Sequence, residues 1–457
     1  GALGLWVLGA AAWHAAADTS ERRRQYVKAL ETLVHDAPND IEAKTFLALQ
    51  IWKNGSWMTE AKKQLPISSH QAVDAILDQV FAVRPMHPAH HYRIHLWDEE
   101  KAAQALVSAS LCGQASPGIA HMWHMPGHTY SKLHRYADAA WQQEASARVD
   151  HAHMMRDGVL PDQIHNYAHS NEWLIRNLAF LGRVNDAIDL AVNMIELPRH
   201  PKYNALDKRS SSAAFGHDRL AGVLEQYECW NQIVGDLQQR CFEAAAGDLD
   251  EQLKKARLSG LAYFGLGDVE QGQKQIAAAE SLLAEKRAAR SKSADEAESK
   301  ARADKKSEAD VAKAMADAMQ SHGPTIQKIE RAIDELKARL ALASGDMAQA
   351  KAALEKLKDA PGIRQDHLAR LLSLSGDHVQ AESLARKEVT GGPGQVYPLA
   401  VLVEVLHRAG KKAEAQAEFS RLRPLAAFAD LDYRVFERLR PIAKEFNLPD
   451  DWRGSSQ

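Results

Sequence analysis

The chain has 457 residues, which is enough for two to four compact domains or for one long solenoid. Its 45% hydrophobic and 26% charged residues are typical of a soluble globular protein, and a formal net charge of -3 excludes a general attraction to nucleic acid or anionic membranes. Alanine, leucine, glutamate and lysine are abundant while runs of β-branched residues are scarce, and this composition predicts an all-α protein.

The cysteines and the apolar N-terminal segment say little about the redox environment or the location of the protein. Cys112, Cys229 and Cys241 are far apart, odd in number and outside any CxxC motif, so we expect buried, unreactive thiols. The apolar start GALGLWVLGAAAWHAAAD has no basic leader and is shorter than the ~20 residues that span a bilayer. We therefore expect a core helix there and a cytoplasmic protein without a membrane span, while the start at Gly1 leaves open a processed N-terminus.

Helices are predicted in pairs along the N-terminal half. The break APND at residues 37–40 ends the first helix, and Asp40 is the expected N-cap of the second. An amphipathic helix is expected at residues 69–83. The pairs that follow are predicted at residues 89–97 with 99–112, 118–134 with 136–152, and 162–182 with 184–197.

A glycine-led turn recurs in the C-terminal half, each time between two predicted helices. It is seen in LGDVEQGQKQIAAAE from Leu266, SGDMAQAKAALEKL from Ser344, SGDHVQAESLARKE from Ser375 and AGKKAEAQAEFSRL from Ala409. Such recurrence is typical of helical repeat arrays. One segment differs: residues 285–318 are rich in Lys, Ala, Glu and Asp without a hydrophobic stripe, which predicts a solvated helical extension or a partly disordered insert.

The recurring turns resemble those of tetratricopeptide (TPR) repeats, in degenerate form over most of the chain. The resemblance implies a right-handed α-solenoid of antiparallel helix pairs, about nine or ten in number. The stretches HMPGHTYSKLHRYADAAWQQEASARVDHAHM, PDQIHNYAHSNEW and FADLDYRVFERLRPIAKEFNLPDDWR also resemble bacterial TPR proteins that carry a C-terminal redoxin domain. We do not expect that domain within this chain, so the resemblance carries over no redox chemistry and implies a redoxin-type domain only as a partner.

The predicted organisation has five parts that differ in composition and regularity. They are N-terminal helical repeats (1–85), a histidine-rich TPR-like core (86–217), further helical repeats (218–284), the charged extension or linker (285–325) and C-terminal TPR-like repeats (326–457).

Histidines concentrate between His87 and Glu172, where twelve of the 21 in the chain lie. We counted back from the small residue expected to open each second helix, namely Ala102, Ala139 or Ala187. At 100° per residue, eight side chains then fall in one sector of roughly 80°, whereas His90 and His134 fall outside it. The eight are His91, His95, His121, His124, His128, His165, His169 and Glu172.

This stripe predicts a transition-metal site on the concave side of the solenoid. Three i,i+4 histidine pairs allow two imidazoles of one helix to bind the same ion, and a set of imidazoles with Glu172 suits copper, iron or zinc. Six such histidines are also enough for two ions. Asp98 and Asp162 are candidates for orienting imidazoles, while Pro126 leaves open a helix start that would place His121 and His124 on a loop.

The pattern does not decide whether the protein is an enzyme. HExxH, Ser-His-Asp, Cys-His and phosphate-binding glycine motifs are absent from the sequence, and the reaction and catalytic residues stay unassigned. The alternative hypothesis is a metal-free TPR scaffold whose polar groove binds a small molecule, a peptide or a partner protein. Metal dependence of stability discriminates between the two.

Overall fold

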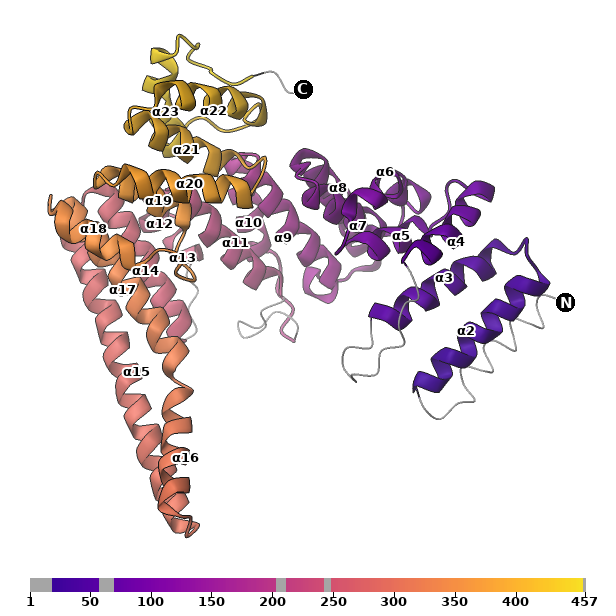
Figure 1. The fold of residues 1–457 in the computed structure, drawn as a ribbon, viewed down its shortest axis with the longest axis horizontal. Helices are drawn as coiled ribbons and strands as arrows, with labels where there is room; N and C mark the ends of the chain where they lie inside the picture. Colours follow the sequence, from indigo (N-terminus) through magenta and orange to yellow (C-terminus); the bar gives the residue numbers. More distant parts are fainter. Residues whose placement is uncertain (1–18, 57–69, 203–210, 242–247, 455–457) are drawn as a thin grey trace. The chain divides into compact units, whose positions relative to one another are not determined.

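The computed structural model describes residues 19–56, 70–202, 211–241 and 248–454 (Figure 1). Every regular element in these residues is a helix, and successive helices pack as antiparallel pairs, which confirms the all-α, TPR-like solenoid architecture. The contacts divide the chain into two compact units, residues 1–174 and 175–457. The helix predicted at the N-terminus lies outside the described residues. Within them, no helix is long and apolar enough to cross a membrane.

The N-terminal unit begins with the predicted helix pair. Asp40 caps the second helix, since one carboxylate oxygen accepts from the amides of Glu42 and Ala43 at 3.0 Å each. The elements of this unit, the last of which continues past its boundary, are α2 (Thr19–Asp36), α3 (Ile41–Ser56), α4 (His70–Val83), α5 (His90–Trp97), η2 (Ala102–Ala105), α6 (Leu106–Ala115), α7 (Ala120–Lys132), α8 (Tyr136–Asp157), η3 (Pro161–Gln163) and α9 (His165–Phe180).

Two local expectations need correction. The helix predicted from residue 99 begins at Leu106, and Ala102 lies in the short 3₁₀ helix η2. Nζ of Lys132 on α7 donates to the backbone carbonyl of Asp98 at 2.6 Å. This carbonyl therefore accepts from a side chain and not only from an amide of a helix that continues past Asp98. Pro126 does not start a helix but lies inside α7, where it is buried, although proline removes one backbone hydrogen bond. His121 and His124 therefore lie on α7 and not on a loop.

The C-terminal unit contains the glycine-led turns that the sequence predicts. Gly267, Gly345, Gly376 and Gly410 each have a positive φ of 77° to 86°, a conformation that glycine adopts without strain. The helices of this unit after α9 are α10 (Val184–Glu196), α11 (Ser212–Gln226), α12 (Trp230–Val234), α13 (Gln238–Cys241), α14 (Leu249–Leu266), α15 (Val269–Ala303), α16 (Glu308–Gln320), α17 (Gly323–Ala343), α18 (Met347–Lys356), α19 (Gln365–Leu374), α20 (His378–Gly391), α21 (Val396–Arg408), α22 (Lys412–Leu425) and α23 (Arg434–Glu445).

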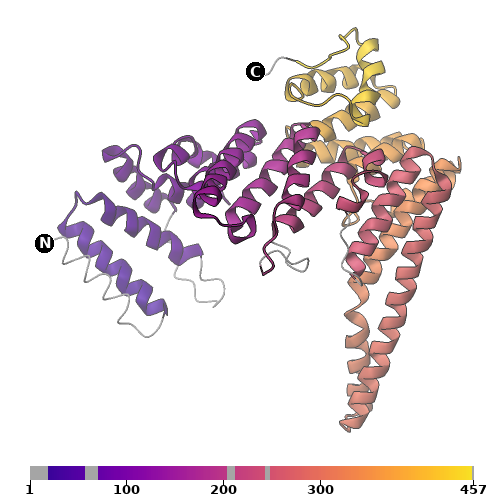
Figure 2. The ribbon, with the colours of Figure 1, turned by 180° about the vertical axis from the view of Figure 1, so that it is seen from behind.

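The charged segment at residues 285–318 is helical throughout, apart from the turn between its two helices. It forms the distal half of the 35-residue helix α15 and most of α16, and the two helices extend as a hairpin from the rest of their unit (Figures 1 and 2). Of α16, only Val311 is buried. The solvated helical extension is therefore the interpretation that fits, and the disordered alternative does not.

The two cysteines whose side chains are described are buried and unpaired, as expected from the sequence. Burial raises the pKa of the Cys112 thiol to about 12 and also raises the pKa of Cys229, so both stay protonated and unreactive at neutral pH. The side chain of Cys241 lies outside the described part.

Buried ion pairs join the helices of the C-terminal unit. Arg257 on α14 donates to Glu225 on α11 at 2.7 Å and to Glu335 on α17 at 2.6 Å. Burial alone would raise the pKa of Glu225, but Arg257 lowers it from 4.5 to about 2. The ionised form of this carboxylate therefore stabilises the packing of the three helices.

We expect the C-terminal unit to lose stability in acid. The pKa of Glu225 is lower in the folded protein than its unfolded value of 4.5, so ionised Glu225 stabilises the fold fully above pH 4.5. This stabilisation is lost as the pH falls towards about 2. The expected loss is on the order of a few kcal/mol between these two pH values. Hydrogen exchange of amides in α11, α14 and α17, corrected for intrinsic rates, measures it. Constant protection from pH 5 to pH 2.5 would contradict it.

Candidate metal centre

Six of the eight predicted residues form two histidine triads in the N-terminal unit. In each triad, three imidazole nitrogens lie within 4.8 Å of one another. Triad A consists of His91, His95 and His121, and triad B consists of His124, His128 and His169.

The two triads are built on the same plan. Each takes an i,i+4 pair from one helix and a single histidine from the next first helix of the array. Helix α5 supplies the pair of triad A and α7 supplies its third member, while α7 also supplies the pair of triad B and α9 its third member. The helix-pair repeat therefore generates two equivalent three-imidazole sites side by side.

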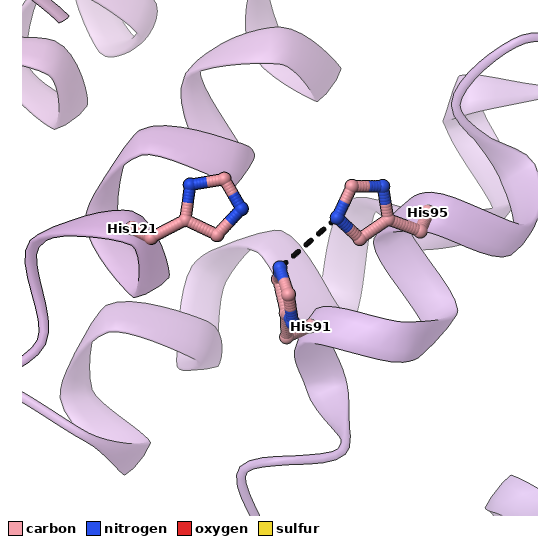
Figure 3. Close-up of side chains that lie close together, drawn as sticks. All are labelled: His91, His95 and His121. Carbon is pink, nitrogen blue, oxygen red and sulfur yellow. Dashed lines mark hydrogen bonds between the residues drawn. The ribbon is translucent and has the colours of Figure 1, made fainter. Parts of the chain in front are cut away.

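The side chains of triad A point toward one another (Figure 3). The Nε2 atoms of His91 and His95 are 3.0 Å apart, and the ring of His121 has its centroid 5.0 Å from that of His91. The ring of Trp52 stacks on His95 at 5.2 Å. This indole limits the rotation of His95 and holds its Nε2 toward the other two rings.

Triad B is more deeply buried. Its central imidazole, His124, is 1% exposed, and its Nε2 lies 2.8 Å from Nε2 of His128. The ring of Trp173 stacks on His128 at 4.2 Å, in the place that Trp52 takes beside triad A. The two triads are neighbours, because the rings of His121 and His124 are stacked with centroids 5.6 Å apart.

Hydrogen bonds fix the tautomers of the α7 histidines. Nδ1–H of His124 donates to Oε1 of Gln143 at 2.7 Å, and Nδ1–H of His121 donates to Oδ1 of Asn166 at 3.3 Å. Since an amide oxygen only accepts, both imidazoles carry an electron pair and no proton on Nε2. Metal-binding histidines are typically held by this kind of outer hydrogen bond.

Asp98 holds the third α7 histidine. Its Oδ2 lies 3.5 Å from Nδ1 of His128 and 3.2 Å from Nζ of Lys132. Burial tends to raise the pKa of Asp98, but His128 and Lys132 lower it overall, so the carboxylate is ionised. An imidazole bonded to a carboxylate is a stronger electron donor than one bonded to an amide, which distinguishes His128 from His121 and His124.

Five of the six imidazoles in the triads have a pKa below the usual value of histidine. Burial, and secondly the neighbouring imidazoles, lower the pKa of His91 to about 3, of His95 to about 4 and of His124 to about 2. Burial also lowers the pKa of His169 and of His121. A neutral imidazole is the form that binds a cation, so we expect little competition from protons at these five histidines.

The remaining two predicted residues lie outside the triads. His165 stacks on His169 with ring centroids 5.6 Å apart, and Glu172 acts on His169 through its charge. Neither belongs to the two groups whose nitrogens converge. His90 and His134, which fall outside the predicted sector, belong to neither triad: His90 bonds to Ser108 and to the Pro85 carbonyl, and His134 lies in a turn.

Sequence reasoning missed the polar layer on α8 behind the histidines. Gln143 accepts from His124 through its side chain and donates to the backbone carbonyl of the same residue at 3.2 Å. Asp150 accepts from Asn166 at 2.7 Å and so orients the amide that holds His121. Gln143 is fully buried, and a glutamine at a core position of a helix is the signal that could have indicated this role.

Gly127 gives Gln143 the space that it occupies. A Cβ at this position would lie 2.3 Å from Nε2 of Gln143, so Gly127→Ala has to displace the amide that fixes His124. We expect metal affinity at triad B to fall by about 10- to 100-fold, as when outer partners of metal-binding histidines are removed. Competitive titration with a chromogenic chelator measures it. Gly118→Ala is the control, since its Cβ would meet nothing within 4 Å, and an equal effect of both changes would refute the explanation.

Comparisons with known proteins do not assign a family. No family model matches the chain, and no curated protein matches it. Among solved structures, "Structure of Naa15/Naa10 bound to HypK-THB" is similar at 11% sequence identity and a TM-score of 0.23, over 97% of this chain and 72% of that chain. With a TM-score this low, the likeness supports no conclusion about either fold or function.

Proposed function

We propose that the N-terminal unit binds two transition-metal ions, one in each histidine triad, on a TPR-like scaffold. The observation that carries this proposal is the convergence of six imidazole nitrogens in two groups within 4.8 Å. A tetrahedral ion with metal–nitrogen bonds of about 2.0 Å requires nitrogens roughly 3.3 Å apart. The Nε2 pairs at 3.0 Å and 2.8 Å need only small adjustments to reach this spacing.

The chemistry of the ligands limits which metal ions the triads would bind. Imidazole nitrogens suit copper, zinc and iron, whereas iron sites that activate dioxygen typically include a carboxylate. Because the converging ligands are all imidazoles, copper or zinc is favoured over iron, and Glu172 enters only as an added ligand or proton carrier.

A metalloenzyme is the more specific form of this proposal. Three protein ligands leave a coordination position open on each ion, as in catalytic sites and unlike closed structural sites. Bound metal would supply Lewis-acid or redox chemistry at that position. The chain's own residues would orient the imidazoles through Gln143, Asn166 and Asp98, and would screen them from water with Trp52 and Trp173.

The test is the metal content of protein purified without an affinity tag or chelator. Mass spectrometry is expected to find about two equivalents, and chelation is expected to lower the stability of the N-terminal unit. Tryptophan emission should also change on reloading with copper, because two indoles stack on ligand imidazoles. If no metal binds even after reconstitution, the proposal is wrong. The histidine-lined groove would then be a binding surface for a peptide, a small molecule or a partner such as a redoxin-type domain.

A further inference from the structure

The two histidine triads have nearly the same shape. The ring centres of triad A lie 4.6, 5.0 and 6.1 Å apart, and those of triad B lie 4.7, 4.8 and 6.3 Å apart. An ion bound about 2.0 Å from a ring nitrogen lies about 3 Å from the ring centre. In both triads, the point equidistant from the three ring centres also lies about 3 Å from each of them. Each ion is therefore expected close to the plane of its three ring centres, with coordination positions open above and below.

Two ligands on α7 determine how the ions lie relative to each other. His121 of triad A and His124 of triad B are three residues apart on this helix. Their rings are nearly parallel, with an interplanar angle of 18°, and the ring centres are 5.6 Å apart. An ion lies near the plane of the imidazole that binds it, because the nitrogen electron pair lies in that plane. The separation of the ions therefore follows from the separation of these two rings and from the direction of their Nε2 atoms.

One layer of hydrogen bonds holds both rings in the same direction. His121 bonds through Nδ1 to Asn166, whose amide group donates to Oγ of Ser146 at 3.3 Å. Ser146 bonds to Ser170 at 2.9 Å, and Oγ of Ser170 lies 3.3 Å from Nδ1 of His124. Both Nδ1 atoms lie against this layer, so both Nε2 atoms point away from it. The two ions are then side by side, roughly 5 to 6 Å apart.

Two ions in these positions carry more positive charge than the nearby side chains balance. None of the converging ligands is a carboxylate, and a neutral imidazole adds no charge to the ion that it binds. Asp98, Asp150 and Glu172 act on triad histidines through their charges, but Lys132 pairs with Asp98. These groups offset the charge of two divalent ions only in part. Because uncompensated charge is costly in a partly buried site, an anion between the ions is stabilised.

We propose that the two ions form one dinuclear centre, in which a small anion of two or three atoms bridges them. This inference rests on the proposed metal binding. Two metal–ligand bonds of about 2 Å each, together with an anion of this length, span about 5 to 6 Å. A single-atom bridge such as hydroxide joins ions only about 3.5 to 4 Å apart. His121 keeps part of its surface in contact with solvent, so an anion can reach the open positions from that side.

Electron paramagnetic resonance (EPR) of protein loaded with Cu(II) in both triads tests the bridge, with azide as the three-atom probe. Each Cu(II) ion has one unpaired electron, and a bridging ligand pairs the electrons of two such ions, which removes their signal. We expect the full signal of both ions without azide and loss of most of it at about one azide per two copper ions. Azide should also bind about tenfold or more tightly than to protein with a single copper ion, because two metal–ligand bonds hold it.

Two variants and a control make the test specific. His128→Ala/His169→Ala and His91→Ala/His95→Ala each leave one complete triad, so azide should not reduce the intensity of their EPR signal. His151→Ala removes an exposed histidine outside both triads and should behave like the wild type.

The outcomes separate this inference from the proposed function. A full signal from two bound copper ions at saturating azide overturns the bridge. A signal that is already lost without azide overturns the separation of the ions on which the bridge rests. Both results leave the proposed metal binding intact, whereas protein that binds no metal refutes the proposed function itself.

Discussion

The double variant His128→Ala/His169→Ala is expected to bind about one equivalent of metal, and the wild-type chain about two, if each triad binds one ion as proposed. Two of the three imidazoles of triad B are lost, whereas triad A keeps all three of its ligands. One remaining imidazole, His124, does not retain an ion against buffer and water, so the affinity of triad B should fall by several orders of magnitude. Metal content by mass spectrometry after gel filtration measures the loss.

The reciprocal variant and a control make this prediction specific. His91→Ala/His95→Ala should remove the other equivalent, because it leaves triad A with His121 alone. His151→Ala removes an exposed histidine of α8 that belongs to neither triad, and its metal content should match the wild type. Loss of both equivalents in either double variant would mean that the triads form one interdependent site. Two equivalents in both would show that the metal lies elsewhere.

The helical fold was predictable because the local signals agree with one another. Asp40 caps the helix it was expected to cap, and the glycine-led turns take the positive φ that only glycine adopts freely. The helix predicted from residue 99 was wrong at its start, and a tertiary contact is found where the preceding helix ends. Lys132 reaches the Asp98 carbonyl across 34 positions of the sequence, and helix periodicity carries no information about such a contact.

The sequence predicted the side of the helices on which the histidines lie, but not which histidines converge in space. Counting residues around a helix placed six of the triad histidines in one sector, but it could not tell which side chains converge across helices. That depends on the offset between α5, α7 and α9, which the packing of each helix on its neighbour sets. The same limit explains why Gln143 was overlooked. Its role follows from the close approach that Gly127 permits and from no pattern along α8.

Glu228→Ala is expected to destabilise the C-terminal unit by about 3–5 kcal/mol, because it removes one of the two carboxylates that pair with the buried guanidinium group of Arg438. Arg438 on α23 donates to both oxygens of Glu228, at 2.6 Å and 3.0 Å, and also to Glu404 on α21 at 2.8 Å. Glu228 itself lies between α11 and α12, so this group of charges connects helices far apart in the sequence. Its φ of 55° is unusual for a residue other than glycine, which indicates that the charge contacts hold the turn in this conformation.

Hydrogen exchange of amides in α21 and α23 measures this loss within its own unit. Glu437→Ala removes an exposed carboxylate from α23 and should change stability by no more than about 0.5 kcal/mol. Glu228→Met/Arg438→Met removes both partners and leaves Glu404 paired with Arg370 at 3.2 Å, so it should regain most of the stability lost in Glu228→Ala. If the double variant were the less stable of the two, the cost would come from lost packing around the turn. The Glu228–Arg438 pair would then stabilise the unit through the packing of its side chains and not through their charges.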